Sequence, residues 1–441
     1  MKTILSLIFI LGQLILFTNH GQSATITVTS IADSGPGTLR DAITQANVSP
    51  AADIIEFKIQ PGGPQHILLN SVLPQITNSD LTIDGTTQIN YSSYNYPIIS
   101  IGENFGSNTV FQANGCNTIF KSLDVSYIFS APASGKGFWI ISPNKTCTIQ
   151  NCWAKNRDDG IVVRFAGTSQ VIIIGNDLTN SGNNGGACLE IAKKNGTLKA
   201  HSNIMGGNTV KAIYLDVVSN IIVGGTTGDL QVGTYLKDIY NPIHVLGGSN
   251  LTFDGINLEK SGTTGHYGMY IMNTAGVTIT NCQFKNRNPG LGLKFCQNFV
   301  KVDCNLFHYN ELGFQFDGIV AGTVQKIQDN NFICNVMAVR QFGTVQMIAR
   351  SNYWNSLSGP PLNGFNGYAG NVDVSNYKII PLSCALPVAW LCGTGTSQIW
   401  ACHIQPGGTT QNMCINLSDA PTHMAHGDSL GKCKPNCCWD K

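Results

Sequence analysis

Three six-residue stretches of the sequence, Ile279-Thr-Asn-Cys-Gln-Phe284, Val302-Asp-Cys-Asn-Leu-Phe307 and Ile327-Gln-Asp-Asn-Asn-Phe332, share one pattern. Each begins with an apolar residue, passes through Asn, Asp or Cys, and ends with an apolar residue. Related stretches occupy residues 173–178, 253–258 and 348–353. The closing residues recur at a mean step of about 25 residues, and a repeat of this length, carried by short strands, predicts a coil of stacked strands.

The closing residues of the repeat are Leu178, Met205, Leu258, Phe284, Phe307, Phe332 and Tyr353. The interval between Met205 and Leu258 is twice the usual step, which indicates one weak copy between them. Segments such as 160–165, 189–191 and 290–295 alternate apolar and other residues, as half-buried strands do. Asn and Gly mark the bends because both tolerate left-handed backbone. We therefore expect an all-β, right-handed parallel β-helix; the alternative, a β-sandwich, would not repeat at a fixed step.

Composition agrees with a solenoid of strands and tight turns. Charged residues make up 12% of the chain and there are 48 glycines, which argues against a helical enzyme or a disordered chain. The net charge is +1, so the sequence carries no electrostatic footprint for nucleic acid.

The first residues predict an export signal. Lys2 is followed by an almost entirely apolar segment at 4–17, and small residues precede a cleavage site after Ser23 or Ala24. An uncleaved anchor is the alternative. With residues 1–24 as signal peptide, we expect a secreted or cell-surface protein without a transmembrane segment in its mature form.

The segment after the signal predicts a cap for the first turn. Residues 25–30 predict a strand, and residues 38–46 predict a short helix that Thr38 caps and that has one apolar face. Ala32-Asp-Ser-Gly-Pro-Gly-Thr-Leu-Arg-Asp-Ala-Ile43 resembles the amino-terminal cap of secreted bacterial β-helix proteins of the pectin-lyase-like superfamily. Asn352-Tyr-Trp354 with Gly359-Pro360 is similar to the closing turns of that superfamily. The resemblance covers residues 25–380 and implies the fold, because its members include lyases, hydrolases, adhesins and proteins of no assigned role.

One candidate site is a column of outward side chains. Aligning the strands places Arg164, Glu190 and Asp216 at equivalent positions on three neighbouring turns. Glu190 and Asp216 would then be spaced like the carboxylate pair of a retaining glycosidase, with Arg164 beside them. The alternative is a surface ladder in which Arg164 neutralises Glu190 and no catalysis occurs.

A second candidate lies at the corner that follows the closing residues, with residue types suited to binding or cleaving a uronic-acid polymer. Its predicted substrate-binding residues are Lys260, His266, Lys285, Arg287, Tyr309 and Glu311. However, the triplet Lys-Asn-Arg occurs at both 155–157 and 285–287, which favours turn chemistry over a unique site. Tyr267, Tyr270 and Tyr309 are aromatic residues able to stack on sugar rings without catalysis.

The last part of the chain, residues 381–441, has a different character. Of the 15 cysteines, 7 lie between Cys384 and Cys438, while Cys116, Cys188 and Cys296 are expected as small apolar core residues. Residues 402–433 resemble a short module at the ends of various secreted bacterial proteins. Such a module is too small for a core and needs staples.

Two kinds of staple fit the module. Disulfides among Cys402, Cys414 and Cys433 are one, and Cys437-Cys438 is able to pair elsewhere. The other is a divalent metal held by His423, His426 and Asp428, with His403 nearby.

Taken together, the sequence predicts a secreted or surface β-helix that binds an extracellular polysaccharide or attaches to a cell surface. The alternative is a polysaccharide lyase or glycoside hydrolase.

Overall fold

The computed structural model describes most of the chain after the predicted signal peptide. The described residues are 23–49, 51–78, 80–104, 109–115, 117–127, 135–141, 146–164, 169–182, 186–194, 197–205, 211–224, 235–236, 239–261, 266–386, 388–393, 395 and 397–433. Residues 1–22 of the predicted signal peptide, Cys116 and Cys437-Cys438 lie outside the described residues. The expected export signal, the core position of Cys116 and the pairing of Cys437-Cys438 therefore stay predictions. No helix in the described part of the chain is both long and apolar enough to cross a bilayer.

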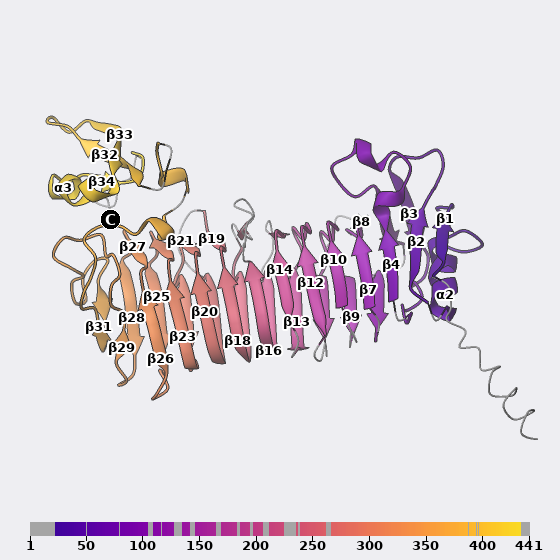
Figure 1. Cartoon of the computed structure of the whole chain (residues 1–441), viewed down its shortest axis with the longest axis horizontal. Coiled ribbons are helices and arrows are strands. Elements are labelled where there is room, and N and C mark those ends of the chain that lie inside the picture. Colours follow the sequence, from indigo (N-terminus) through magenta and orange to yellow (C-terminus); the bar gives the residue numbers. More distant parts are fainter. Residues whose placement is uncertain are drawn as a thin grey trace, which may run out of the picture.

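The chain winds into parallel strands stacked along the long axis of the molecule (Figure 1). Each turn contributes strands to three faces, and equivalent residues of neighbouring turns are in register, as Ile213, Ile243 and Met269 are. The expected right-handed parallel β-helix is confirmed.

In each turn the chain passes through faces 1, 2 and 3 in that order, and each face consists of parallel strands from successive turns. The strands of face 1 are β6 (Phe111–Asn114), β9 (Lys136–Ile141), β11 (Asp159–Arg164), β13 (Leu189–Lys194), β22 (Leu291–Lys294), β25 (Leu312–Asp317), β28 (Met337–Phe342) and β30 (Tyr368–Ala369). Three long strands run across faces 1 and 2 without interruption: β16 (Ile213–Gly224), β18 (Ile243–Asp254) and β20 (Met269–Thr280).

Faces 2 and 3 complete each turn. Face 2 contains β1 (Thr25–Val28), β2 (Asp53–Phe57), β4 (Asp80–Asp84), β7 (Asn117–Lys121), β10 (Thr146–Gln150), β12 (Gln170–Ile174), β14 (Leu198–His201), β23 (Gln297–Asp303), β26 (Val324–Gln328), β29 (Met347–Ile348) and β31 (Val372–Asp373). Face 3 contains β3 (Gln65–Leu69), β5 (Ile99–Glu103), β8 (Leu123–Asp124), β15 (Ile204–Met205), β17 (Tyr235–Leu236), β19 (Asn257–Glu259), β21 (Gln283–Lys285), β24 (Leu306–His308) and β27 (Asn331–Ile333).

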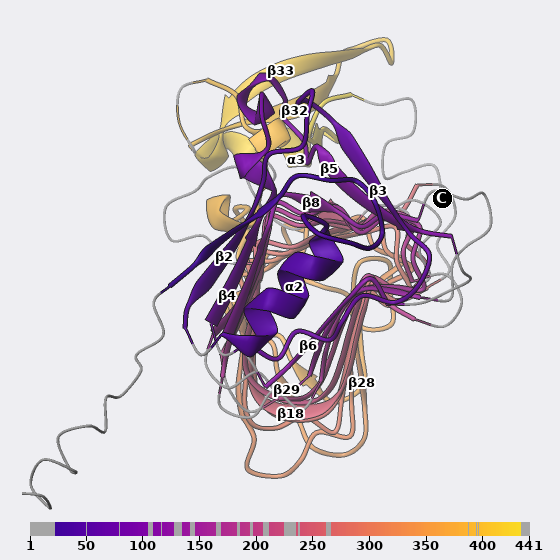
Figure 2. The same cartoon turned by 90° about the vertical axis from the view of Figure 1, so that its right-hand side faces the viewer.

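The amino-terminal cap is confirmed. Helix α2 (Leu39–Val48) lies across the first turn (Figure 2) and buries Leu39, Ala42, Ile43 and Ala46. The side chain of Thr38 accepts a hydrogen bond from the backbone N–H of Asp41, the capping contact that the sequence predicted. The helix thereby covers an end at which unpaired strands would otherwise be exposed.

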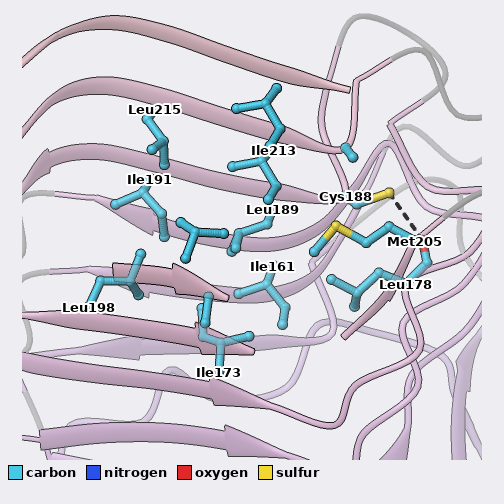
Figure 3. Close-up of a cluster of buried hydrophobic side chains, with 14 of the residues drawn as sticks. Ile161, Ile173, Leu178, Cys188, Leu189, Ile191, Leu198, Met205, Ile213 and Leu215 are labelled. Carbon is cyan, nitrogen blue, oxygen red and sulfur yellow. Dashed lines mark hydrogen bonds between the residues drawn. The ribbon is translucent and has the colours of Figure 1, made fainter. Parts of the chain in front are cut away.

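The inward positions form one continuous apolar core. Columns such as Ile161, Leu189 and Ile213 point into the coil, where Leu178 and Met205 meet them from face 3 (Figure 3). Leu236 occupies the position between Met205 and Leu258, so the weak copy of the repeat exists. Cys188 and Cys296 are buried, unoxidised members of this core, as expected.

The closing residues of the later turns form an aromatic stack. Phe284, Phe307 and Phe332 have successive ring centroids 4.8 and 4.9 Å apart, and Trp354 continues the stack at 4.8 Å. The sequence assigned the last place to Tyr353, and this was wrong by one residue. Asn331 pairs with Tyr353, so Tyr353 faces outward, where the carboxy-terminal module covers it.

The bends are held by buried asparagine ladders. Along one corner, Asn305 Nδ2 donates to Asn330 Oδ1 at 3.0 Å, and Asn330 Nδ2 donates to Asn352 Oδ1 at 2.9 Å. The same oxygens also accept backbone N–H bonds from the preceding turn, for example Asn305 N to Asn330 Oδ1 at 3.0 Å. A second corner repeats this arrangement with Asn310 and Asn335. Each ladder residue satisfies backbone groups that a bend would leave unpaired in the interior.

The carboxy-terminal module lies beside face 3 at the last turns (Figure 1). Its strands β32 (Gln398–Ile404), β33 (Thr410–Asn416) and β34 (Ser429–Leu430) are antiparallel, and α3 (Ala420–Ala425) packs on them. The module also contains the one-turn 3-10 helices Ser383–Ala385, Val388–Trp390 and Leu417–Asp419. Two further 3-10 helices, Gly85–Thr87 and Tyr91–Ser93, lie in the early turns of the coil. Disulfides within the described residues join Cys402 to Cys433, Cys392 to Cys414 and Cys304 to Cys384. The last of these ties the module to the coil.

Replacing Asn330 by Ala tests the ladder. We expect the free energy of unfolding to fall by about 3 kcal/mol, because buried donors and acceptors on two turns lose their partners. Equilibrium urea unfolding followed by circular dichroism measures this change. Gln297→Ala, which removes an exposed amide from the preceding turn, is the matched control and should shift stability by less than about 0.5 kcal/mol. Equal effects of the two substitutions would contradict a structural role for the ladder.

Candidate functional site

An aromatic row runs along the outside of face 1. Glu190, Tyr214, His244 and Tyr270 occupy one register position on β13, β16, β18 and β20. All four are half-buried. Since stacked strands lie about 4.8 Å apart, the row presents one polar or aromatic side chain per turn along the axis of the coil.

His244 lies at the centre of the row, with three tyrosines around it. Its ring centroid is 6.0 Å from those of Tyr214 and Tyr270 and 5.8 Å from that of Tyr267, in edge-to-face arrangements. The Tyr267 hydroxyl and His244 Nδ1 are 3.0 Å apart, within hydrogen-bond distance. His244 Nε2 is buried and has no hydrogen-bond partner among the described residues.

Burial sets the protonation of these rings. Burial, reinforced by the positive charge of Lys211, lowers the pKa of His244 below its ordinary value. Burial and the neighbouring Tyr270 raise the pKa of Tyr267 to about 12. The pair is therefore an uncharged imidazole beside an uncharged phenol at neutral pH.

A glycine ends the row. Gly292 follows Tyr270 in register on β22, and a Cβ atom there would come within 2.6 Å of Tyr270 Cδ2. The tyrosine ring therefore lies against the backbone of the next turn. A larger residue at position 292 would displace the ring.

The predicted column of Arg164, Glu190 and Asp216 is wrong in register. Arg164 pairs with Ala192, and Ala192 pairs with Asp216, whereas Glu190 pairs with Tyr214 two residues earlier. The strand alignment failed at β13: the step from Arg164 to its partner Ala192 is 28 residues and the step from Ala192 to Asp216 is 24, instead of 26 each, so Glu190 alone leaves the column. Arg164 still reaches Glu190 diagonally, with Nε 3.0 Å from Oε1, and forms an ion pair with it. Glu190 and Asp216 nevertheless both influence one tyrosine: burial, followed by the negative charges of Asp216 and Glu190, raises the pKa of Tyr214.

The predicted corner set is only partly available to a ligand. Arg287 is fully buried and donates to the carbonyl oxygens of Ile239 and Glu259, so its place in a substrate-binding set was wrong. Lys285 forms an ion pair with Glu259. The repeated Lys-Asn-Arg triplet is explained as turn chemistry, because Arg157 is likewise buried and forms an ion pair with Glu103.

The remaining corner residues are dispersed around the bend. The ring of His266 lies against that of Tyr240 in a tilted arrangement, with ring centroids 3.3 Å apart, and burial, followed by the charges of Lys260 and Arg287, lowers the pKa of His266. Tyr309 packs against the core of the carboxy-terminal module. Glu311 is exposed, and its backbone N–H donates to Arg287 O at 3.0 Å. The roles predicted for Lys260, His266, Tyr309 and Glu311 stay predictions.

In the carboxy-terminal module, the structure changes the predicted metal ligands. His403, His423 and Asp428 converge, and their possible ligand atoms lie within 4.8 Å of one another. His426 is exposed and lies outside this group, so its inclusion was wrong. The sequence grouped His423 with His426 because of their ligand types and close spacing, but His426 is the C-cap residue that follows α3. Burial would raise the pKa of Asp428, but hydrogen bonds from His403, the Ile404 backbone and His423 outweigh it and lower that pKa.

Tyr214 and His244 were not among the residues predicted from the sequence. Their signal is present as three apolar-aromatic-apolar triplets, at residues 213–215, 243–245 and 269–271, separated by about one repeat. Each central residue points outward between two buried neighbours. An alignment anchored on these triplets would also have corrected the register of Glu190.

No protein-family model and no curated protein matches the chain. Several solved structures resemble it at low TM-score. Geobacillus virus E2 ORF18 has 12% identity, a TM-score of 0.39 and an alignment covering 80% of this chain, and this chain spans 59% of that protein. The A-module of the mannuronan C-5 epimerase AlgE4 from Azotobacter vinelandii has 10% identity, a TM-score of 0.38 and coverage of 81% and 99%. DFA-IIIase from Arthrobacter chlorophenolicus A6 has 12% identity, a TM-score of 0.33 and coverage of 81% and 86%. These distant likenesses assign no role to any residue.

The protonation of His244 is directly measurable. We expect its titration midpoint, followed by NMR of the imidazole protons, to lie below 6.5. Because folding disfavours the imidazolium, His244 contributes stability above that pH, and this contribution is lost as the pH falls toward the folded-state pKa. Lys211→Gln should raise the midpoint by removing a neighbouring charge. Lys199→Gln, at an exposed position of β14, should leave it unchanged, and a midpoint at or above 6.5 would show that the imidazole is not desolvated.

Proposed function

We propose that the face-1 row binds an extracellular polysaccharide that lies along the axis of the coil. The register of Tyr214, His244 and Tyr270 supports this proposal most directly. Three rings on consecutive turns offer a repeating contact to a repeating polymer, and Tyr267 widens the aromatic surface next to them. Rigid aromatic side chains bind large apolar surfaces at low entropic cost.

The charges around the row favour an uncharged, hydroxyl-rich polymer. Two positively charged residues, Arg164 and Lys211, and two negatively charged residues, Glu190 and Asp216, lie near the row. The two signs cancel, so a polyanion gains no net attraction. The carboxylates accept hydrogen bonds from hydroxyl groups, and the tyrosine hydroxyls both donate and accept.

Export fits this role. Disulfides such as Cys392–Cys414 and Cys402–Cys433 persist in oxidising surroundings, and the predicted signal peptide would deliver the chain there. A glycan of a cell surface bound on face 1 would also attach the protein to that surface.

Glycoside hydrolysis is the second candidate, and the position of Tyr214 favours it over a lyase. Glu190 pairs with Tyr214 from the preceding turn, and Asp216 lies two residues after Tyr214 on the same strand, so two carboxylates flank this tyrosine on neighbouring turns. Paired carboxylates are the catalytic groups of most glycosidases. The ion pair between Arg164 and Glu190 opposes this role, because it occupies an oxygen of the carboxylate that would have to act on the substrate.

The binding proposal is tested with the double substitution Tyr214→Ala and Tyr270→Ala. Affinity electrophoresis against neutral glycans and polyuronates should identify a neutral glycan that retards the native protein. The double variant should bind that glycan at least about tenfold more weakly, since each stacking contact contributes roughly 1 kcal/mol. Tyr377→Ala, which removes an exposed tyrosine outside the row, is the matched control and should bind normally.

The same samples separate binding from hydrolysis. New reducing ends that disappear in Glu190→Gln or Asp216→Asn would establish a hydrolase. Binding without new reducing ends supports the lead proposal. Unchanged affinity in the double tyrosine variant, or retention on polyuronates alone, would refute it.

A further inference from the structure

Three separate segments of the carboxy-terminal module bring two imidazoles and a carboxylate together. His403 comes from β32, His423 from α3, and Asp428 from the turn before β34. His403 Nδ1 and His423 Nδ1 lie 2.8 and 2.7 Å from the same oxygen, Asp428 Oδ2. We call these three side chains the His-His-Asp cluster.

The second oxygen of Asp428 is held by the backbone. Ile404 N donates to Asp428 Oδ1 at 2.9 Å, which fixes the plane of the carboxylate. The carboxylate is 1% exposed, while the side chains of His403 and His423 are 26% and 19% exposed. Solvent and solutes therefore reach the cluster from the histidine side. A hydrogen bond that orients a carboxylate ligand is a regular feature of metal sites.

The donor set and geometry suit a transition metal. Two imidazole nitrogens and one carboxylate oxygen are ligand types that Zn²⁺ prefers. The two imidazole rings are at 84° to each other, so they approach from different directions. Ligand bonds of about 2.0–2.2 Å in tetrahedral geometry would need each N···O separation to widen by only roughly half an ångström.

Disulfides hold the cluster in place. Cys402, next to His403, is bonded to Cys433, and Cys392 is bonded to Cys414 on β33. Strands β32 and β33 pair along their whole length, from Gln398 with Asn416 to Ile404 with Thr410. A module this small gains stability from staples of this kind, and a metal adds another.

The cluster adjoins a cavity between the module and the end of the coil. The cavity has a volume of about 520 Å³, and Asp428 and Met424 line it from the module. Trp354, Pro360 and Phe365 line it from the coil. Trp354 is 1% exposed, and its indole N–H has no hydrogen-bond partner among the described residues.

We propose that His403, His423 and Asp428 bind one divalent transition-metal ion of the zinc type, with an open coordination position on the solvent-exposed histidine side. Three protein ligands and one open position are the arrangement of zinc sites that bind water or a small ligand. This site is independent of the face-1 row, so either proposal can fail without the other.

Isothermal titration of the chelator-treated, full-length protein with Zn²⁺ tests the proposal. We expect saturable binding of one ion per chain. Asp428→Asn and His423→Ala should each weaken binding at least about 100-fold, because each removes a direct ligand. His426→Ala, which removes the neighbouring exposed histidine, is the matched control and should bind like the native protein.

Co²⁺ supplies a readout that needs no variant. The native protein loaded with Co²⁺ should show the visible absorption of a four-coordinate nitrogen and oxygen site, and Zn²⁺ should displace it. Far-UV circular dichroism checks that each variant keeps its fold. Absence of saturable Zn²⁺ binding by the native protein would show that the cluster is only a hydrogen-bonded staple. Equal loss in His426→Ala and Asp428→Asn would also overturn the assignment.

Discussion

The structure depends on the satisfaction of backbone groups where each turn bends. A parallel coil pairs its strands readily, but every bend directs N–H and C=O groups into the interior. The ladders built from Asn305, Asn330 and Asn352, and from Asn310 and Asn335, receive these groups and link each turn to the next. They also fix the register, because a turn displaced by one residue would lose its ladder contacts as well as its core packing.

This use of the interior determines where function is able to lie. Side chains that point inward are committed to packing or to ladders, and even charged residues are recruited for that purpose. Arg157 and Arg287 are fully buried in equivalent bends, where their guanidinium groups bind carbonyl oxygens. Ligands therefore meet the outward positions, and in-register stacking turns any outward side chain that recurs into a row. Tyr214, His244 and Tyr270 form such a row.

The carboxy-terminal module is stabilised by different interactions from those of the coil. It buries little apolar surface of its own, so disulfides, contacts with face 3 and the His-His-Asp cluster hold its strands. Its position beside the last turns covers Tyr353 and encloses a cavity that neither part has alone. The two candidate sites thus differ in origin: repetition produces the row on face 1, whereas the meeting of three segments within the module produces the His-His-Asp cluster.

The sequence alone determined the repeat, the parallel coil and the cap helix, because each depends on local patterns such as the apolar face of residues 39–46 and the periodic closing residues. Only the tertiary structure decided the register and the partners. A two-residue error separated Glu190 from Asp216, and a one-residue error exchanged Tyr353 for Trp354. Spacing along the chain specifies how often a pattern returns, but which atoms meet across neighbouring turns depends on bends of unequal length. The convergence of His403 with Asp428 is a contact of this kind, since it requires three separate segments to fold together.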